Sequence, residues 1–83
     1  MEKEVGTIIH FYPKIMVAVV RVSDSLKVGE TIRIAGHTTN FTQTVDSLQI
    51  EHQQVQEVQK GETVGLRVAE WAREGDKIYR VTE

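Results

Sequence analysis

Valine and isoleucine fill most of the apolar positions of this chain, and no segment repeats apolar residues at the three- and four-residue spacing of an amphipathic helix. Branching at Cβ restricts these side chains in a helix, whereas they pack well on the pleated surface of a sheet. Short runs in which apolar and polar residues alternate are separated by turn-forming residues. The sequence therefore predicts an all-β protein.

About six strands are expected from these runs, in residues 5–12, 15–22, 31–36, 41–50, 63–68 and 76–82. Local turns join them and no crossover helix intervenes, which is typical of an antiparallel sheet. Closing such a sheet into a barrel removes its exposed edges. We therefore predict a small closed antiparallel barrel of the Greek-key type, formed by residues 1–83 as a single domain.

Two segments do not follow the simple alternation. In residues 41–50 the apolar side chains before and after positions 46–47 fall on opposite faces, so we expect a β-bulge there. Residues 51–60 are polar apart from Val55 and Val58. This second segment is predicted to be a long loop or a single helical turn, held to the core by the two valines.

The composition limits where the protein can work. The chain of 83 residues has no cysteine, so it can form neither a disulfide nor a thiolate metal site, and a reducing compartment suits it. Its longest apolar run, residues 15–20, is far shorter than the roughly 20 residues of a membrane helix. The N-terminus lacks the features of a secretory signal. We expect a cytoplasmic protein that does not contact a membrane.

The charge of the chain is close to balanced. A formal net charge of −2 argues against binding nucleic acid through a general positive field, so any RNA contact has to be local. Residues 1–40 carry five basic and four acidic groups, which gives +1, whereas residues 41–83 carry five and eight, which gives −3. The first half is therefore the better place to look for contacts with phosphate.

Four short motifs follow one another along the chain. They are KVGETIRI at residues 27–34, TQTVDSLQIEH at 42–52, KGETVGL at 60–66 and REGD at 73–76. Their order and spacing, over about residues 5–82, resemble the second, β-barrel domain of translational GTPases such as elongation factors Tu and 1-alpha. Gly29, Gly61 and Gly75 each precede an acidic residue and a new strand, and we predict that they take positive φ in turns.

The resemblance implies a translation elongation factor-like binding module whose partners are rRNA, tRNA, the ribosome or a translation-related protein. The GxxxxGK[ST] loop that cradles phosphates is missing, so GTP hydrolysis is not expected. Similar barrels also occur as accessory domains of other enzymes, peptidases and RNA-modifying proteins among them. A barrel for protein–protein interaction or homodimerisation, with no role for nucleic acid, is the alternative.

Residues with chemical potential are scattered. His10, His37 and His52 belong to different expected elements and have no cysteine or carboxylate partner at ligand spacing, so no metal site is predicted. The serines fall in turns or near the expected bulge, which does not suit a nucleophile in a pocket. We therefore expect no catalytic residues, no cofactor and no enzyme activity.

The candidate binding residues form two groups. Basic side chains on or beside the expected strands are the candidates for RNA contacts, namely Arg33, Arg67, Arg80 and Lys27. Ile15 and Val17, in the nearly continuous apolar run of the second strand, are candidates for a protein interface. Trp71, in an expected loop, either caps an end of the barrel or is a further interface candidate.

Overall fold

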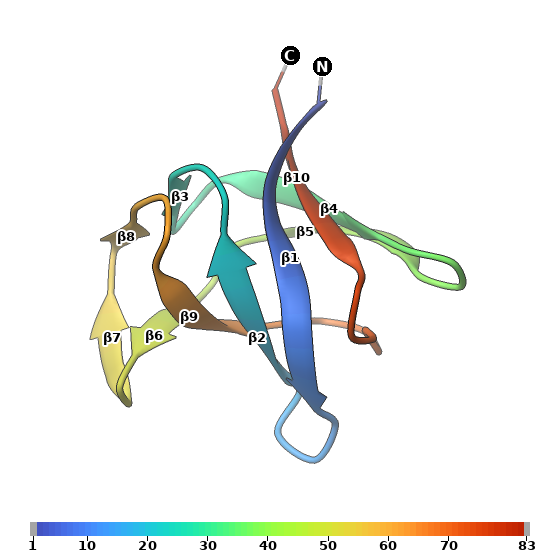
Figure 1. Ribbon diagram of the computed structural model, residues 1–83, viewed down its shortest axis with the longest axis horizontal. Coiled ribbons are helices and arrows are strands. Elements are labelled where there is room, and N and C mark those ends of the chain that lie inside the picture. Colours follow the sequence, from blue (N-terminus) through green and yellow to red (C-terminus); the bar gives the residue numbers. More distant parts are fainter. Residues whose placement is uncertain (1, 83) are drawn as a thin grey trace.

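The structure, a computed structural model, describes residues 2–82 and contains ten β-strands there. They are β1 (Glu2–Tyr12), β2 (Val17–Val22), β3 (Leu26–Lys27), β4 (Thr31–Ala35), β5 (Asn40–Thr44), β6 (Leu48–Ile50), β7 (Gln53–Val55), β8 (Glu57–Val58), β9 (Thr63–Arg67) and β10 (Lys77–Val81). Every pairing between them is antiparallel (Figure 1). The predicted all-β, antiparallel class is confirmed. None of the described residues forms a helix that could cross a membrane.

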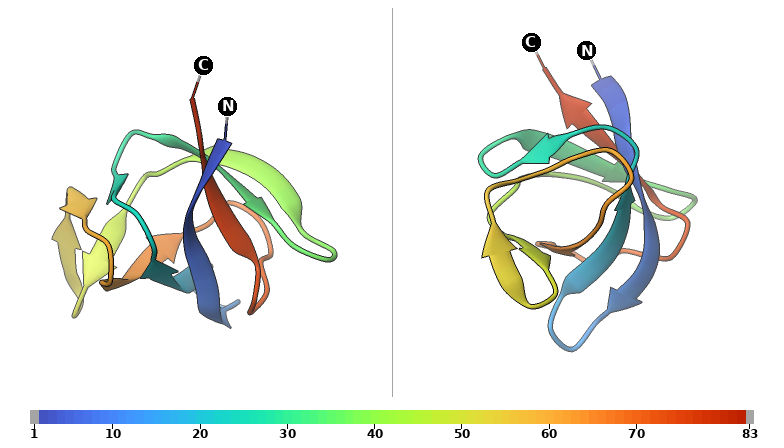
Figure 2. Two further views of the ribbon diagram at one scale, coloured as in Figure 1. Left: turned by 45° about the horizontal axis from the view of Figure 1, so that its top comes forward. Right: turned by 60° about the vertical axis from the view of Figure 1, so that its left-hand side comes forward.

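Eight strands form one sheet in the order β5-β4-β10-β1-β2-β9-β6-β7, and β3 pairs separately with β8. The large sheet curls round on itself (Figure 2), but its end strands β5 and β7 do not pair with each other in the described part of the chain. The predicted closed barrel of about six strands is therefore wrong in two respects: the ladder is open, and it contains more and shorter strands.

On the open side of the curled sheet, the side chain of Gln43 connects β5 to the chain at the end of β9. Gln43 of β5 donates from Nε2 to the carbonyl oxygen of Arg67 at 2.9 Å, and its Oε1 accepts from the backbone N–H of Ala69 at 2.7 Å. The amide of Gln43 therefore occupies the place of a peptide group in a ladder, between β5 and the chain that follows β9.

The core lies inside the curl and follows the alternation read from the sequence. Ile32 and Ile34 of β4 point inward, as expected, and both are fully buried. Burying an aliphatic side chain of this size stabilises the fold by roughly 1.5–3 kcal/mol. The other large side chains that are fully buried come from five further strands: Ile8, Leu26, Leu48, Leu66 and Ile78.

The expected bulge at residues 46–47 is absent, because residues 41–50 do not form one strand. β5 ends at Thr44 beside β4, and β6 begins at Leu48 beside β9 on the other side of the sheet. The apolar side chains change face at residues 46–47 because the chain passes there from β5 to β6. The irregular registers lie in β1 instead, between Glu4 and Gly6 and between Ile8 and His10.

Residues 51–60 form neither a long loop nor a helical turn. Ile50 pairs with Gln53, so Glu51 and His52 alone connect β6 and β7. Both take positive φ, 51° and 67°, which is the geometry of a type I′ hairpin turn. The two valines do anchor this segment, since Val58 is buried and Val55 packs against the core.

Three turns repeat one design. Gly29, Gly61 and Gly75 have φ of 97°, 92° and 91°, as predicted, in a region that side chains disfavour. The acidic residue after each glycine accepts a hydrogen bond from the backbone N–H three residues before it. The pairs are Lys27 to Glu30 at 2.7 Å, Gln59 to Glu62 at 3.0 Å and Arg73 to Asp76 at 2.8 Å.

Candidate binding groove

A groove runs over the outer face of the sheet where β2, β9 and β6 lie side by side. Val17 and Val19 of β2 point outward, away from the buried residues that alternate with them. In the neighbouring strand Gly65 pairs with Val19 on one side and with Gln49 of β6 on the other. Because Gly65 has no side chain, the surface is low between the valines and the glutamine. We call this hollow the outer groove.

Two turns border the outer groove. Tyr12 and Ile15, at the β1–β2 turn, are 48% and 62% exposed, and Glu51 and His52 belong to the β6–β7 turn. The hollow next to these turns has a volume of about 240 Å³, and it shares Ile15, Val17, Gln49 and Gly65 with a second hollow of about 190 Å³. The two therefore form one continuous depression with an apolar wall.

The second hollow has a polar rim formed by Ser47, Gln54 and Arg67. The hydroxyl and amide groups can both donate and accept hydrogen bonds, and the guanidinium offers a planar set of donors. Among residues 2–82, Arg67 forms no ion pair. The outer groove thus combines an apolar floor with an unneutralised cation at one end.

Gly65 is not required by the packing around it. A Cβ atom there would lie 3.5 Å from Cγ1 of Val17 and 3.7 Å from the carbonyl oxygen of Gln49, which are ordinary contacts, and its φ is outside the left-handed region. At Gly6, by contrast, a Cβ would lie 2.7 Å from Cγ1 of Val20. A glycine inside a strand lowers stability by roughly 0.5–1 kcal/mol relative to alanine, so the presence of glycine at position 65 calls for an explanation other than packing.

The structure places the predicted interface residues in two locations. Ile15 and Val17 lie together in the outer groove. Trp71 is elsewhere, with its ring edge-on to Phe11 at 5.3 Å between centroids, and it is 57% exposed. Of the four basic candidates only Arg67 lines the groove.

Arg33, on the outer face of β4, forms an ion pair with Glu2 of β1. Its guanidinium binds the carboxylate of Glu2 through two hydrogen bonds of 2.7 and 2.8 Å and lies 5.1 Å from the ring centre of Tyr79. The hydrogen bond from Arg33 lowers the pKa of Glu2, and Glu2 in turn raises the pKa of Arg33. This guanidinium is therefore already paired with an anion.

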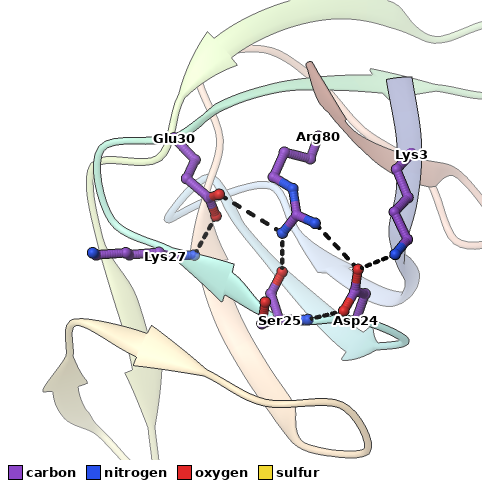
Figure 3. Close-up of polar contacts among 6 residues, drawn as sticks. All are labelled: Lys3, Asp24, Ser25, Lys27, Glu30 and Arg80. Carbon is purple, nitrogen blue, oxygen red and sulfur yellow. Dashed lines mark hydrogen bonds and ion pairs between the residues drawn. The ribbon is translucent and has the colours of Figure 1, made fainter. Parts of the chain in front are cut away.

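Arg80 lies on the opposite face of the sheet. It follows the buried Ile78 by two residues, so both side chains are on the inner face of β10. Figure 3 shows it between the β2–β3 loop and the following turn. Its guanidinium donates to the carbonyl oxygen of Ser25 at 2.8 Å and contacts Asp24 at 3.2 Å and Glu30 at 3.7 Å. Arg80 thus ties the loop, the turn and β10 together.

Two further residues complete this cluster. The ammonium of Lys3 lies 2.9 Å from the carboxylate of Asp24, and hydrogen bonds from Lys3 and from the backbone N–H of Ser25 lower the pKa of that carboxyl. Lys27 contributes its backbone N–H, which donates to Glu30 (Figure 3). Arg80 and the backbone of Lys27 thus meet at Glu30, whereas Arg33 and Arg67 lie elsewhere, so the four basic candidates do not form one common patch.

The three histidines are not brought together. His10 contacts the ring of Tyr12 at 4.4 Å and lies 3.8 Å from the carboxylate of Glu74, while His52 is in the β6–β7 turn. No group of three or more His, Cys, Asp or Glu that could hold a metal ion occurs within residues 2–82.

Comparison with known proteins gives sequence relatives that are much longer than this chain. No family model matches. An uncharacterized protease of Methanocaldococcus jannaschii is 41% identical over 81 residues, which cover 96% of this chain and 20% of that protein. A collagenase of Porphyromonas gingivalis is 35% identical over 78 residues, which cover 92% of this chain and 22% of the collagenase. The chain thus spans about a fifth of the length of these relatives.

Two crystal structures share the fold. Both are of the C-terminal domain of a candidate U32 peptidase from Geobacillus thermoleovorans, with TM-scores of 0.89 and 0.88 over 94% of this chain. The matched regions cover 99% and 91% of the two solved chains, and each of these chains is 16% identical in sequence to this one. The curled sheet described above therefore occurs as a separate domain in a longer protein.

These findings correct three predictions. The resemblance to translation factors is wrong, because the sequence relatives are named as a protease and a collagenase and the similar structures come from a candidate peptidase. The translation-related binding role is contradicted for the same reason. The expectation of no enzyme activity is contradicted as well, since the relatives are named as enzymes, although this chain spans only about a fifth of their length. Three of the four motifs contain a Gly–acid turn, and its local hydrogen bonding serves any small antiparallel sheet.

Proposed function

We propose that this chain is a domain of a U32-type peptidase and binds the protein substrate for it. The observation that carries the proposal is the identity of 41% and 35% to a protease and a collagenase, which extends over nearly the whole chain. The fold of a candidate U32 peptidase's C-terminal domain agrees with it. Peptide-bond cleavage in this proposal belongs to the longer protein, of which the chain corresponds to about a fifth.

The outer groove supports the substrate-binding part of the proposal. Exposed apolar side chains gathered in one depression mark interaction sites on protein surfaces, and Tyr12 and Ile15 are exposed at its border. The two hollows share four lining residues, and in this proposal they together accommodate a short extended segment of polypeptide. Gln49 and Gln54 carry amides that can bond both the N–H and the C=O groups of such a chain.

The β1–β2 turn that borders the groove lies far from the paired residues Glu2 and Val81. Glu2 pairs with Val81, so β1 begins where β10 ends, and the β1–β2 turn lies at the opposite end of the molecule (Figure 1). If further chain precedes Glu2, as it does in the Geobacillus protein, whose domain is the C-terminal one, the connection is made beside Glu2. The turn that borders the groove then points away from the junction.

A chimera tests the proposal. The matching 78 residues of the Porphyromonas collagenase are replaced by this chain, and cleavage of collagen is compared with that of the intact enzyme and of a variant lacking the segment. We expect the deletion to abolish cleavage and the chimera to restore it. A deletion variant as active as the intact enzyme, or a folded chimera as inactive as the deletion, contradicts the proposal.

The cytoplasmic location stays a prediction from the cysteine-free sequence. Fractionation of the source cells with an antibody against the chain measures it directly. Recovery from outside the cytoplasm would remove this part of the proposal and leave the substrate-binding role intact.

A further inference from the structure

The floor of the outer groove offers a place for one apolar side chain. Gly65 leaves the outward surface of Val17 uncovered, and Ile15 stands beside it with 62% of its surface exposed. The packing and the backbone conformation would both accept a Cβ atom at position 65. Glycine inside a strand often marks a site where another chain approaches closely. The open floor is therefore best explained by something that fills it.

The cation at the end of the groove offers a place for a carboxylate. Arg67 follows Gly65 by two residues, so it rises from the same outer face of β9. Arg33 and Arg80 are paired with Glu2, Asp24 and Glu30, whereas Arg67 has no ion pair among the described residues. A guanidinium matches a carboxylate in a planar, bidentate geometry.

The spacing between the two places is that of an extended chain. Residues i and i+2 of a strand lie about 7 Å apart on one face. An extended peptide lying along β9 has the same repeat, so an apolar side chain over Gly65 puts the side chain two positions away over Arg67. The residue between them points to solvent. Gln49 and Gln54 are beside the backbone of such a peptide.

We infer that the outer groove binds an extended polypeptide in which an apolar residue and an acidic residue are separated by one position, with the apolar side chain on Gly65 and the carboxylate on Arg67. This inference rests on the proposed function, since it names the class of polypeptide that the domain selects. It assigns Arg67 and Gly65 as residues that determine specificity.

Fluorescence anisotropy of short labelled peptides tests the inference. The probes have Gly-Ser flanks and the centre Leu-Thr-Glu, Leu-Thr-Gln, Ser-Thr-Glu or Leu-Thr-Lys, and they are titrated with the full chain. We expect Leu-Thr-Glu to bind best and each single replacement to weaken binding about tenfold or more, because it removes either a charge-assisted hydrogen bond or the apolar contact. Equal binding of all four peptides, or binding of none, overturns the inference.

Three variants locate the site. Arg67→Glu should reverse the preference so that Leu-Thr-Lys binds better than Leu-Thr-Glu, and Gly65→Val should abolish binding by filling the floor. Arg21→Glu makes the same charge change on the exposed outer face of β2, away from the lining of the groove, and should leave the preference unchanged. If Arg67→Glu keeps the preference for Leu-Thr-Glu, the inference fails even though the variant is folded.

The substrate-binding role of the domain and the peptide selectivity of its groove can fail separately. An active collagenase chimera together with peptides that bind without discrimination would remove the groove assignment and keep the substrate-binding role. Discrimination between peptides together with an inactive, folded chimera would remove the proposed function instead. Sedimentation of the free chain decides one more alternative, because a stable dimer that Gly65→Val dissociates would mean that a second copy occupies the groove.

Discussion

Gln43 holds the open side of the curled sheet with the two hydrogen bonds of one amide, so replacing it by alanine should destabilise the whole domain. A net hydrogen bond is worth roughly 0.5–1.5 kcal/mol, and because this amide is partly exposed to water we expect a loss of about 1–2 kcal/mol in the free energy of unfolding. A chain of 83 residues typically has about 4–12 kcal/mol in total. The loss is therefore a substantial fraction, and it corresponds to a drop of roughly 4–16 °C in Tm.

Urea and thermal denaturation measure this effect, and two variants sharpen it. Gln43→Glu keeps the oxygen that accepts from Ala69 but cannot donate to Arg67, so it should lose about half as much stability near neutral pH. Gln54→Ala removes an exposed amide that has no side-chain hydrogen bond within residues 2–82 and should change little. If the free energy of unfolding of Gln43→Ala is within about 0.3 kcal/mol of the wild-type value, the two hydrogen bonds do not hold the open side of the sheet together.

Three further substitutions test other parts of the fold. His52→Gly should stabilise the hairpin by about 1 kcal/mol in urea denaturation, because position 52 has φ of 67°; no gain would mean that the turn is not strained. Gly36→Ala should destabilise by about 1–3 kcal/mol, since its Cβ would overlap the buried carboxylate of Asp76; a wild-type Tm would contradict this. The pair of Glu2 and Arg33 should stabilise the fold above the ordinary Glu pKa of 4.5 and lose this effect as the pH falls through the lowered pKa of Glu2. Tm measured between neutral and acidic pH should therefore fall less in Glu2→Gln than in the wild type, and parallel curves would argue against the linkage.

Local patterns were sufficient for much of the fold. Alternation placed Ile32 and Ile34 in the core, and the Gly–acid pairs located three turns. The sequence did not reveal β7, because its glutamines have no strong strand preference and the strand forms by pairing across the turn at residues 51–52. Nor did it reveal the open ladder, which depends on where the chain crosses after Thr44 and on a side-chain contact between distant residues.

The candidate site was only half visible in the sequence. Ile15 and Val17 stood out because the second strand is apolar on both faces. Their relation to Gly65 and Arg67 depends on the register between β2 and β9, which no local pattern fixes. Gly65 interrupts an otherwise regular strand, but the hollow above it becomes apparent only once its neighbours Val19 and Gln49 are known. Arg33 and Arg80 were predicted as candidates for RNA contacts because their acidic partners, Glu2 and Asp24, are distant in the sequence and could not be recognised from it.

The pairing of Glu2 with Val81 has a consequence for how such a domain can be combined with others. Opposed residues in an antiparallel pair are about 5 Å apart, so the polypeptide enters and leaves this fold at nearly the same point. A unit of this shape can be spliced into a surface loop of a host protein, or added to one of its ends, without stretching the host. Such an insertion or fusion does not require any change in the sheet of the domain itself.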